Sequence, residues 1–181
     1  MIIDIEKVEA AKKGDKDMFA QVYDAVAPDL YKVALYTLGN PHDAEDVVSD
    51  TFLDAYKGIP QLRDPSKFKF WIMKILSAKC KRKISEYIRR KTHIDLESFT
   101  AGFGELPDLT ADMTERTEVI QALGRLSEQE RMLISLAVVQ GYTIRATASI
   151  IGAPQGTVSS KLHRSLGKLR KMLSDDSILQ N

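Results

Sequence analysis

The sequence predicts an all-α protein made of two small helical domains joined by a flexible linker, with a helix-turn-helix in the second domain. Strand signals are nearly absent, since the chain has neither Asn-Gly hairpin turns nor long alternations of apolar and polar residues. Glycines, prolines and capping residues instead punctuate segments with helical apolar periodicity. Residues 95–113 break that periodicity with two glycines, a proline and scattered acids, which is typical of a linker. We therefore expect domains at 1–94 and 114–176.

The apolar periodicity also places the individual helices. In the first domain it predicts helices near residues 4–13, 16–26, 28–38, 41–57 and 67–91. In the second domain it predicts helices near residues 114–125, 128–140, 144–151 and 154–173. Glycines that follow these segments are expected to cap helix C-termini: Gly14, Gly39, Gly58, Gly141 and Gly152. Prolines are expected in first helical turns at Pro28, Pro41 and Pro154.

Composition is ordinary for a globular protein. The chain has 181 residues, of which 44% are hydrophobic and 28% are charged. Cys80 is the only cysteine, which excludes a disulfide framework and a thiol metal site. No apolar run approaches the roughly 18 residues that span a bilayer, and the acidic start is unlike a signal peptide. We expect a cytoplasmic protein without stable membrane insertion, metal or other cofactor.

The second domain carries the signals of a helix-turn-helix. Ser127 and Glu130 have the spacing of a capping box at the start of one helix, and Thr143 can cap the next. Ala148, Gly152 and Val158 then occupy the spacing of the small residue, the turn glycine and the packing aliphatic of that motif. The helix that follows Gly152 is therefore expected to be a recognition helix.

The charge of that helix indicates its ligand. Residues 145–174 contain six Lys or Arg and neither Asp nor Glu, whereas solvated helix faces usually mix both signs. A basic helix without function is the alternative, but such one-sided charge is typical of contact with a polyanion, and the helix size suits a DNA major groove. An apolar stripe at Val158, Leu162, Leu166, Leu169 and Leu173 should face inward. The candidate DNA contacts are Gln155, Thr157, Ser159, Ser160, Lys161, His163, Arg164 and Lys168.

The predicted helix 41–57 carries an acidic stripe in the first domain. Asn40 can cap it, and the stripe consists of Asp43, Asp46, Asp50 and Asp54. Such a stripe costs self-repulsion in an isolated helix, so it is either a solvated face or a surface for a basic partner. A metal site is disfavoured because one helix cannot wrap carboxylates around an ion.

The next helix has the opposite character. Residues 66–91 begin with Phe68, Phe70 and Trp71 and continue with many lysines and arginines, Glu86 being the lone acid. Aromatic and basic side chains together suit unpaired bases beside a phosphate track. Phe68 and Trp71, at helical spacing, are expected to be core residues instead, whereas the basic face is expected to bind nucleic acid.

With these motifs in order, the chain resembles a bacterial RNA polymerase sigma factor of the extracytoplasmic-function group. The resemblance lies in "MFAQVYDAVAPDLYKVALYTLGNPHDAEDVVSDTFLDAYKGI", in "FKFWIMKIL" and in "LSEQERMLISLAVVQGYTIRATASIIGAPQGTVSSKLHRSLGKLRKML". It covers nearly everything outside the linker.

The resemblance implies a role for each domain. The acidic helix would bind the clamp helices of the largest subunit of core RNA polymerase through Asp46, Ser49, Asp50 and Leu53. The promoter −10 element would be captured by Arg63, Lys67, Lys69, Phe70, Lys74 and Lys81. The second domain would dock on the polymerase flap and read the −35 element of promoter DNA, and the linker would thread the RNA exit path. An anti-sigma factor is an expected partner.

Some positions depart from the pattern of that family. Ser49 stands where glutamine is preferred, and Ser159 replaces a common Lys or Arg. Ala78 and Arg82 stand where Asn and Asp are usual. Residues 145–147 replace an acid–acid–aliphatic start of the helix-turn-helix. The family's base preferences therefore do not carry over to this chain.

A free-standing helix-turn-helix regulator is the competing hypothesis, with the first domain serving for dimerisation or sensing. It does not explain an acidic helix followed by a basic aromatic one. An enzyme has little support, because the sequence has no glycine-rich phosphate loop or metal-ligand cluster, and His42, His93 and His163 are scattered. No catalytic residue is expected.

Overall fold

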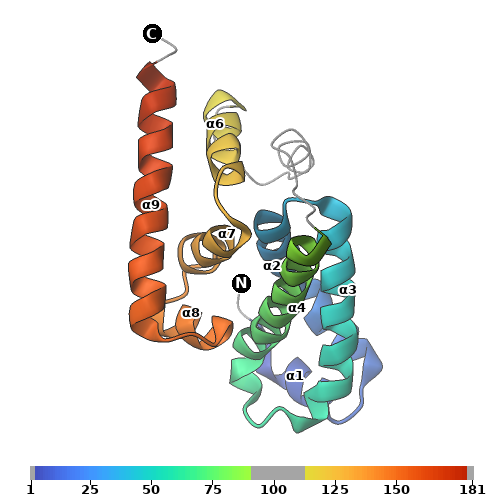
Figure 1. The fold of residues 1–181 in the computed structure, drawn as a ribbon. Coiled ribbons are helices and arrows are strands. Elements are labelled where there is room, and N and C mark those ends of the chain that lie inside the picture. Colours follow the sequence, from blue (N-terminus) through green and yellow to red (C-terminus); the bar gives the residue numbers. More distant parts are fainter. Residues whose placement is uncertain (1–2, 91–112, 179–181) are drawn as a thin grey trace.

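A computed structural model describes residues 3–90 and 113–178 of the chain. Every element within these ranges is helical, which confirms the all-α prediction. The first group comprises α1 (Ile5–Lys12), α2 (Lys16–Leu38), α3 (Pro41–Gly58), the short 3₁₀ turns η1 (Ile59–Gln61) and η2 (Pro65–Lys67), and α4 (Phe68–Arg90). The second group comprises α6 (Met113–Gly124), α7 (Glu128–Ile134), the π-helical turn η3 (Ser135–Val139), α8 (Ile144–Ile151) and α9 (Gln155–Ile178) (Figure 1). The predicted linker lies outside the described residues except for Met113.

The first group packs around α2, which contacts α1, α3 and α4. Local capping starts these helices: the Asp15 carboxylate accepts from the amides of the first turn of α2, and the Asn40 side chain accepts from Asp43 N. The apolar stripes then meet in a core that includes Leu30, Leu35 and Phe68. The prediction that Phe68 is a core residue is confirmed, since only 1% of it is exposed.

Two helices predicted at 16–26 and 28–38 are in fact the single helix α2. Pro28 lies inside it instead of starting a new helix, so that prediction was wrong. Proline lacks an N–H and so removes one hydrogen bond from the ladder. The apolar stripe of α2 continues from Val26 through Leu30 to Val33, all buried. Tertiary packing on both sides of the proline thus outweighs its local cost.

Gly58 also differs from its predicted role as a C-terminal cap, because it is the last residue of α3 and the cap position is Ile59. Its φ of −93° is an ordinary helical value, whereas Gly39 has φ 72° and caps α2 as expected. A Cβ on Gly58 would lie 3.1 Å from Cζ2 of Trp71. Glycine here leaves room for the indole ring, which packs half-buried against the core beside Phe68 and would have to move by a few tenths of an ångström to admit a Cβ.

The second group builds the predicted helix-turn-helix from α8 and α9. The capping box of Ser127 and Glu130 starts α7 as predicted, and the Thr143 hydroxyl accepts from Ala146 N at the start of α8. Gly152 ends α8 with φ 70°, and Ala148 and Val158 are buried at the crossing. The helix predicted at 128–140 is found as α7 followed directly by the π-helical turn η3, which ends at Val139.

We expect the turn glycine to contribute to stability through its backbone alone. Gly152→Ala should lower the free energy of unfolding by about 1 kcal/mol, because a left-handed φ is unfavourable for an alanine, while no atom lies within 4 Å of the added Cβ. Gly167→Ala is the matched control: it lies inside α9 with similar open space, so it should raise that free energy by roughly 0.5–1 kcal/mol. Denaturant titration of both variants tests this. Equal losses would contradict it.

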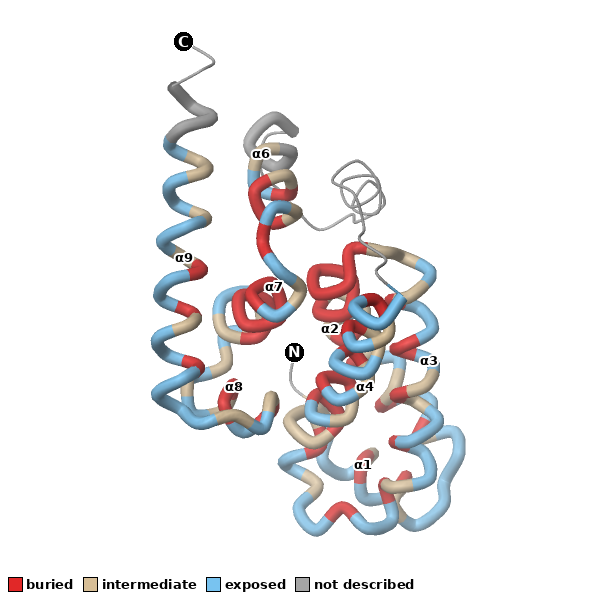
Figure 2. The backbone as a smooth tube through the Cα atoms, viewed as in Figure 1, coloured by how far each residue is buried: buried red, intermediate tan, exposed pale blue. Residues whose placement is uncertain are grey.

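The two groups of helices lie directly against each other. α7 and η3 pack on α2, and α8 packs on α4. Figure 2 shows buried segments gathered in α2 and α7, at the centre of the molecule. Within residues 3–90 and 113–178, no helix is long and apolar enough to cross a membrane.

Candidate nucleic-acid interface

The first three turns of α9 present most of the predicted base-contacting residues to solvent. Val158, Leu162 and Ser165 are buried against the domain, which orients the opposite side of the helix outward. The C-terminal part of the predicted inward stripe is half-buried and consists of Leu166, Leu169 and Leu173. The exposed positions are Gln155, Thr157, Ser159, Ser160, His163 and Arg164. No carboxylate lies among them, so this surface is fit to approach a polyanion.

Two of the predicted contacts are held inside the second domain. The Lys161 ammonium donates to the Gln129 side chain at 2.6 Å, and Lys168 donates to the Glu130 carboxylate at 2.7 Å. Lys161 is half-buried, whereas the Lys168 side chain remains 55% exposed. These bonds tie α9 to α7 and fix the angle at which the recognition helix projects.

Glu130 is the centre of this tie. Its burial alone would raise the pKa of its carboxyl, but hydrogen bonds from Lys168 and from the Ser127 amide and hydroxyl outweigh that effect and lower the pKa to about 2. The folded domain thus stabilises the charged form of Glu130, although the side chain is only 11% exposed.

We expect this carboxylate to make stability depend on pH. The pKa of Glu130 is depressed in the folded state, so its contribution is present above the ordinary glutamate pKa of about 4.3 and is lost as pH falls toward 2. The loss should reach about 3 kcal/mol at most. Denaturant unfolding at pH 7 and pH 3 measures about half of this loss, because the folded-state carboxyl is still largely charged at pH 3, and Glu130→Gln is the control. A Gln variant with the same pH dependence as the natural chain would contradict this assignment.

The predicted −10 residues lie around the start and along one side of α4. Arg63 and Lys67 are exposed in the segment before the helix. Lys69 forms an ion pair with Asp29 of α2, with 2.6 Å between Nζ and Oδ2, so its ammonium group is engaged within the domain. The Lys74 ammonium lies 5.7 Å from the centroid of the Phe70 ring, a cation–π arrangement that presents both at the surface.

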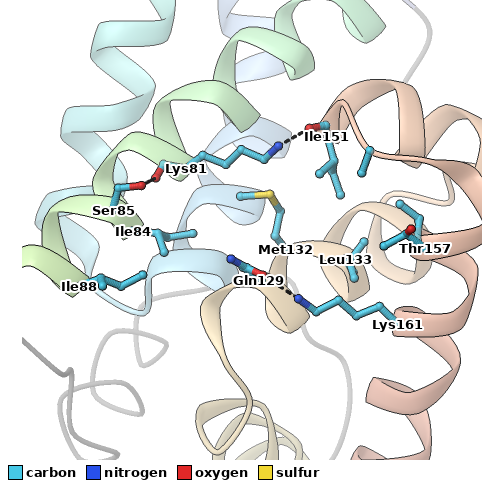
Figure 3. Close-up of a pocket in the computed structure, with 12 residues that line it drawn as sticks. Lys81, Ile84, Ser85, Ile88, Gln129, Met132, Leu133, Ile151, Thr157 and Lys161 are labelled. Carbon is cyan, nitrogen blue, oxygen red and sulfur yellow. Dashed lines mark hydrogen bonds between the residues drawn. The ribbon is translucent and has the colours of Figure 1, made fainter.

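Lys81 instead contacts the other domain. Its ammonium donates to the Ile151 carbonyl at the end of α8 (Figure 3). Beside this bond runs a groove of 360 Å³ between α4 and the helix-turn-helix, whose apolar lining includes Ile84, Met132 and Leu133. Thr157 and Lys161 of the predicted −35 set line its opposite wall. The structure thus places members of both predicted DNA-binding sets on one interdomain groove.

The acidic stripe of α3 is for the most part paired with the basic series of α4, a relation that the sequence interpretation missed. Lys83 lies 2.5 Å from Asp43, Lys79 lies 2.6 Å from Asp54, and Arg82 lies 2.9 Å from Asp50. These helices pack against each other, so opposite charges meet. The hydrogen bond from Lys79 outweighs partial desolvation and lowers the pKa of Asp54. The only sign of this pairing in the sequence was that the acids of α3 and the bases of α4 both recur every three or four residues.

The remaining α3 residues form an exposed patch. Asp46 has no salt-bridge partner among the described residues, and Ser49 is exposed beside it. Leu53 is 53% exposed and Tyr56 is 43% exposed, and both lie on the same face of α3 as Asp46 and Ser49. We name Asp46, Ser49, Leu53 and Tyr56 the α3 patch. Tyr56 was not predicted as a site residue, and its exposure is visible only in the fold.

The described residues contain no group of three or more His, Cys, Asp or Glu side chains that could hold a metal ion. Cys80 is buried in α4, and this burial raises the pKa of its thiol to about 12.

The two groups of helices and the acid-free face of α9 define a two-domain helical protein with a nucleic-acid-binding helix-turn-helix.

Comparison with known proteins identifies the family. Residues 22–93 match the family model Sigma-70 region 2, and residues 116–169 match Sigma-70, region 4, so the two matches together span more than half of the chain. ECF RNA polymerase sigma factor SigW of Bacillus subtilis is 28% identical, over 94% of this chain and 96% of its own. SigM of Mycobacterium tuberculosis, of the same class, is 28% identical over 94% of this chain and 84% of its own. The chain belongs to the extracytoplasmic-function group of sigma-70 factors.

Solved structures agree on the fold. CnrH, in complex with the cytosolic domain of CnrY, superposes with a TM-score of 0.66 at 22% identity and covers 96% of this chain and 99% of its own. The sigma factor RpoE of Bartonella quintana, in complex with the anti-sigma factor NepR, superposes with a TM-score of 0.67 at 24% identity. That match covers 86% of this chain and 96% of RpoE.

Proposed function

We propose that this sigma factor binds core RNA polymerase through α3, captures the −10 element through α4 and reads the −35 element through α9. The observation that carries the proposal is the order of the two family matches, region 2 before region 4, on a chain whose exposed α9 face lacks acids. We take residues 1–94 and 114–176 as the two functional domains. The protein acts in the cytoplasm and has no catalytic residue of its own.

The α3 patch is the proposed polymerase contact. Asp46 lies near the basic residues of α4 but forms no salt bridge with them in the described part, so its carboxylate can pair with a basic residue of the clamp helices. Leu53 and Tyr56 add apolar surface that is exposed to water in the isolated protein. Asp50 is also a proposed contact, but it is shared with Arg82 and Lys79.

The proposed −10 surface consists of Arg63, Lys67, Lys69, Phe70, Lys74 and Lys81. The exposed Lys74 and the adjacent Phe70 ring combine a phosphate contact with a surface on which an unpaired base can stack. Lys79, Arg82 and Lys83 are engaged by α3, so we assign them to holding α4 in place.

An anti-sigma factor is the proposed regulatory partner. The Bartonella relative was solved with one bound, and it shares the two-domain fold of this chain. The groove between α4 and the helix-turn-helix has an apolar floor and lysines on its walls, which fits an amphipathic segment with acidic flanks.

Run-off transcription tests the proposal. Purified core polymerase is incubated with promoter-bearing fragments of the host genome, with and without the protein. We expect protein-dependent transcripts whose start sites align to reveal both elements, with a steep loss at high salt as phosphate contacts weaken. No transcripts, together with tight binding of the protein alone to duplex DNA, would favour a stand-alone regulator instead.

A further inference from the structure

The groove between α4 and the helix-turn-helix has the size of a site for a small molecule. Its volume of 360 Å³ lies near the low end of the range of small-ligand pockets, about 300–1,000 Å³. One turn of an α-helix, about 10 Å across and 5.4 Å long, occupies roughly 400 Å³. A partner helix could therefore place only side chains in this groove, whereas a small molecule can enter it entirely.

Most of the groove lining is apolar. The apolar residues come from α4, from α7 and from the helix-turn-helix, and they include Ile84, Ile88, Met132, Leu133, Ile151 and Val158. Ile88 is 67% exposed, so part of this apolar lining is in contact with water. Covering such a surface with hydrocarbon is favourable, because it removes apolar area from water. The lining therefore favours a ligand that has a hydrocarbon chain.

Two lysines extend toward the groove from opposite walls, with Met132 between them (Figure 3). The Lys81 ammonium donates to the Ile151 carbonyl, and the Lys161 ammonium donates to the Gln129 side-chain oxygen. Both acceptors are uncharged. Within the described part of the chain no Asp or Glu lines the groove, and neither lysine forms a salt bridge. A carboxylate in the groove would thus gain charge-assisted hydrogen bonds without displacing an acidic side chain.

The surroundings of Lys81 point the same way. Partial desolvation lowers the pKa of its ammonium group, and no neighbouring carboxylate offsets this effect. An anion beside Lys81 would favour the charged form of the lysine. The site thus combines an apolar lining with cations that an anionic ligand would stabilise.

We propose that this groove binds an alkyl carboxylate, whose chain packs on the apolar lining and whose carboxylate accepts hydrogen bonds from Lys81 and Lys161. A second polar group along the chain would face the apolar residues and lose its hydrogen bonds to water, which is costly. The favoured ligand therefore has a single charged end. Both lysines also belong to the proposed promoter contacts, so the ligand and promoter phosphates would compete for them. This consequence rests on the proposed function, whereas the binding site does not.

Equilibrium dialysis of the full-length protein against radiolabelled decanoate tests the site without DNA or polymerase. We expect saturable binding of one decanoate per chain. Octanoate should bind about fifteenfold more weakly, because each buried methylene contributes roughly a fourfold gain in affinity. Decanol has the same chain without the charge and should bind about ten- to a hundredfold more weakly, the effect of one hydrogen bond to a charged group.

Three variants locate the site, and a fourth is the matched control. Lys81→Met and Lys161→Met each remove one ammonium group but keep a long side chain, and each should weaken decanoate binding about tenfold or more. Ile88→Glu places an acid at an exposed position of the lining, and the repulsion between carboxylates should weaken binding by a similar factor. Lys171→Met removes an exposed lysine of α9 outside the groove and should bind decanoate as the natural chain does.

The two lysine variants lie on different domains, so one of them carries the test if circular dichroism finds the other unfolded. The site would be overturned by the lack of saturable decanoate binding, by equal affinity for decanoate and decanol, or by unchanged affinity in every folded groove variant. If a synthetic amphipathic peptide with acidic flanks bound in the groove and decanoate did not, the groove would belong to a protein partner alone. None of these results bears on run-off transcription, which tests the proposed function separately.

Discussion

Replacing Arg164 with alanine should reduce transcription from promoters with an intact −35 element by tenfold or more, while core polymerase affinity stays unchanged. Arg164 is exposed on α9, next to His163 and on the side away from the buried Val158 and Leu162. An arginine that reaches a base edge contributes about 1–3 kcal/mol of discrimination. Transcription and polymerase binding by the same variant are measured in parallel.

The promoter and a second variant serve as controls. With a scrambled −35 element, Arg164→Ala should no longer differ from the natural chain, since the contact that it removes is already lost. Arg170→Ala removes an exposed arginine six residues further along α9, on another side of the helix, and should retain −35 selectivity. If Arg164→Ala also lowered the affinity for core polymerase, Arg164 would contact the polymerase and not the −35 element.

Reversing the charge at Asp46 should weaken core polymerase binding by tenfold or more. Asp46 is exposed in the α3 patch and has no salt-bridge partner in the described part of the chain, so Asp46→Lys changes the surface without breaking an ion pair of the fold. Placing a lysine against the basic site that we propose on the clamp adds repulsion to the lost attraction. Binding is measured by titrating labelled core polymerase at two salt concentrations.

The matched control is Glu9→Lys, the same charge change on an exposed position of α1. It should bind polymerase normally. Asp50→Lys is a poorer test, because it would break the pairs with Arg82 and Lys79 as well as any polymerase contact. Unchanged affinity in Asp46→Lys would refute the role of the α3 patch.

The sequence predicted the second domain closely because its signals are local. The Ser127 and Glu130 capping box, the left-handed Gly152 and the buried Val158 all act within a few residues of their partners. The exposed face of α9 followed from the same periodicity. Errors arose where packing overrode local preference, as at Pro28, and where a neighbouring ring decided a residue's role, as at Gly58.

For the first domain, the sequence predicted which helix faces are charged but not what lies against them. Periodicity places Asp50 and Arg82 on their own helix faces, yet their meeting at 2.9 Å depends on how α3 packs on α4. The choice of Asp46 over Asp50 as the cleaner test of polymerase binding therefore required the fold.

The helical class, the order of the two domains, the helix-turn-helix and the basic face of α9 could be predicted from the amino-acid sequence, because each depends on residues close together in the chain. Which charged side chains remain unpaired, and that the two groups of helices pack against each other, became visible only in the folded chain. A contact between the domains illustrates this: Nε of Arg131 in α7 donates to the main-chain carbonyl of Thr37 in α2. Every residue type carries such a carbonyl, so no side-chain pattern could have identified it.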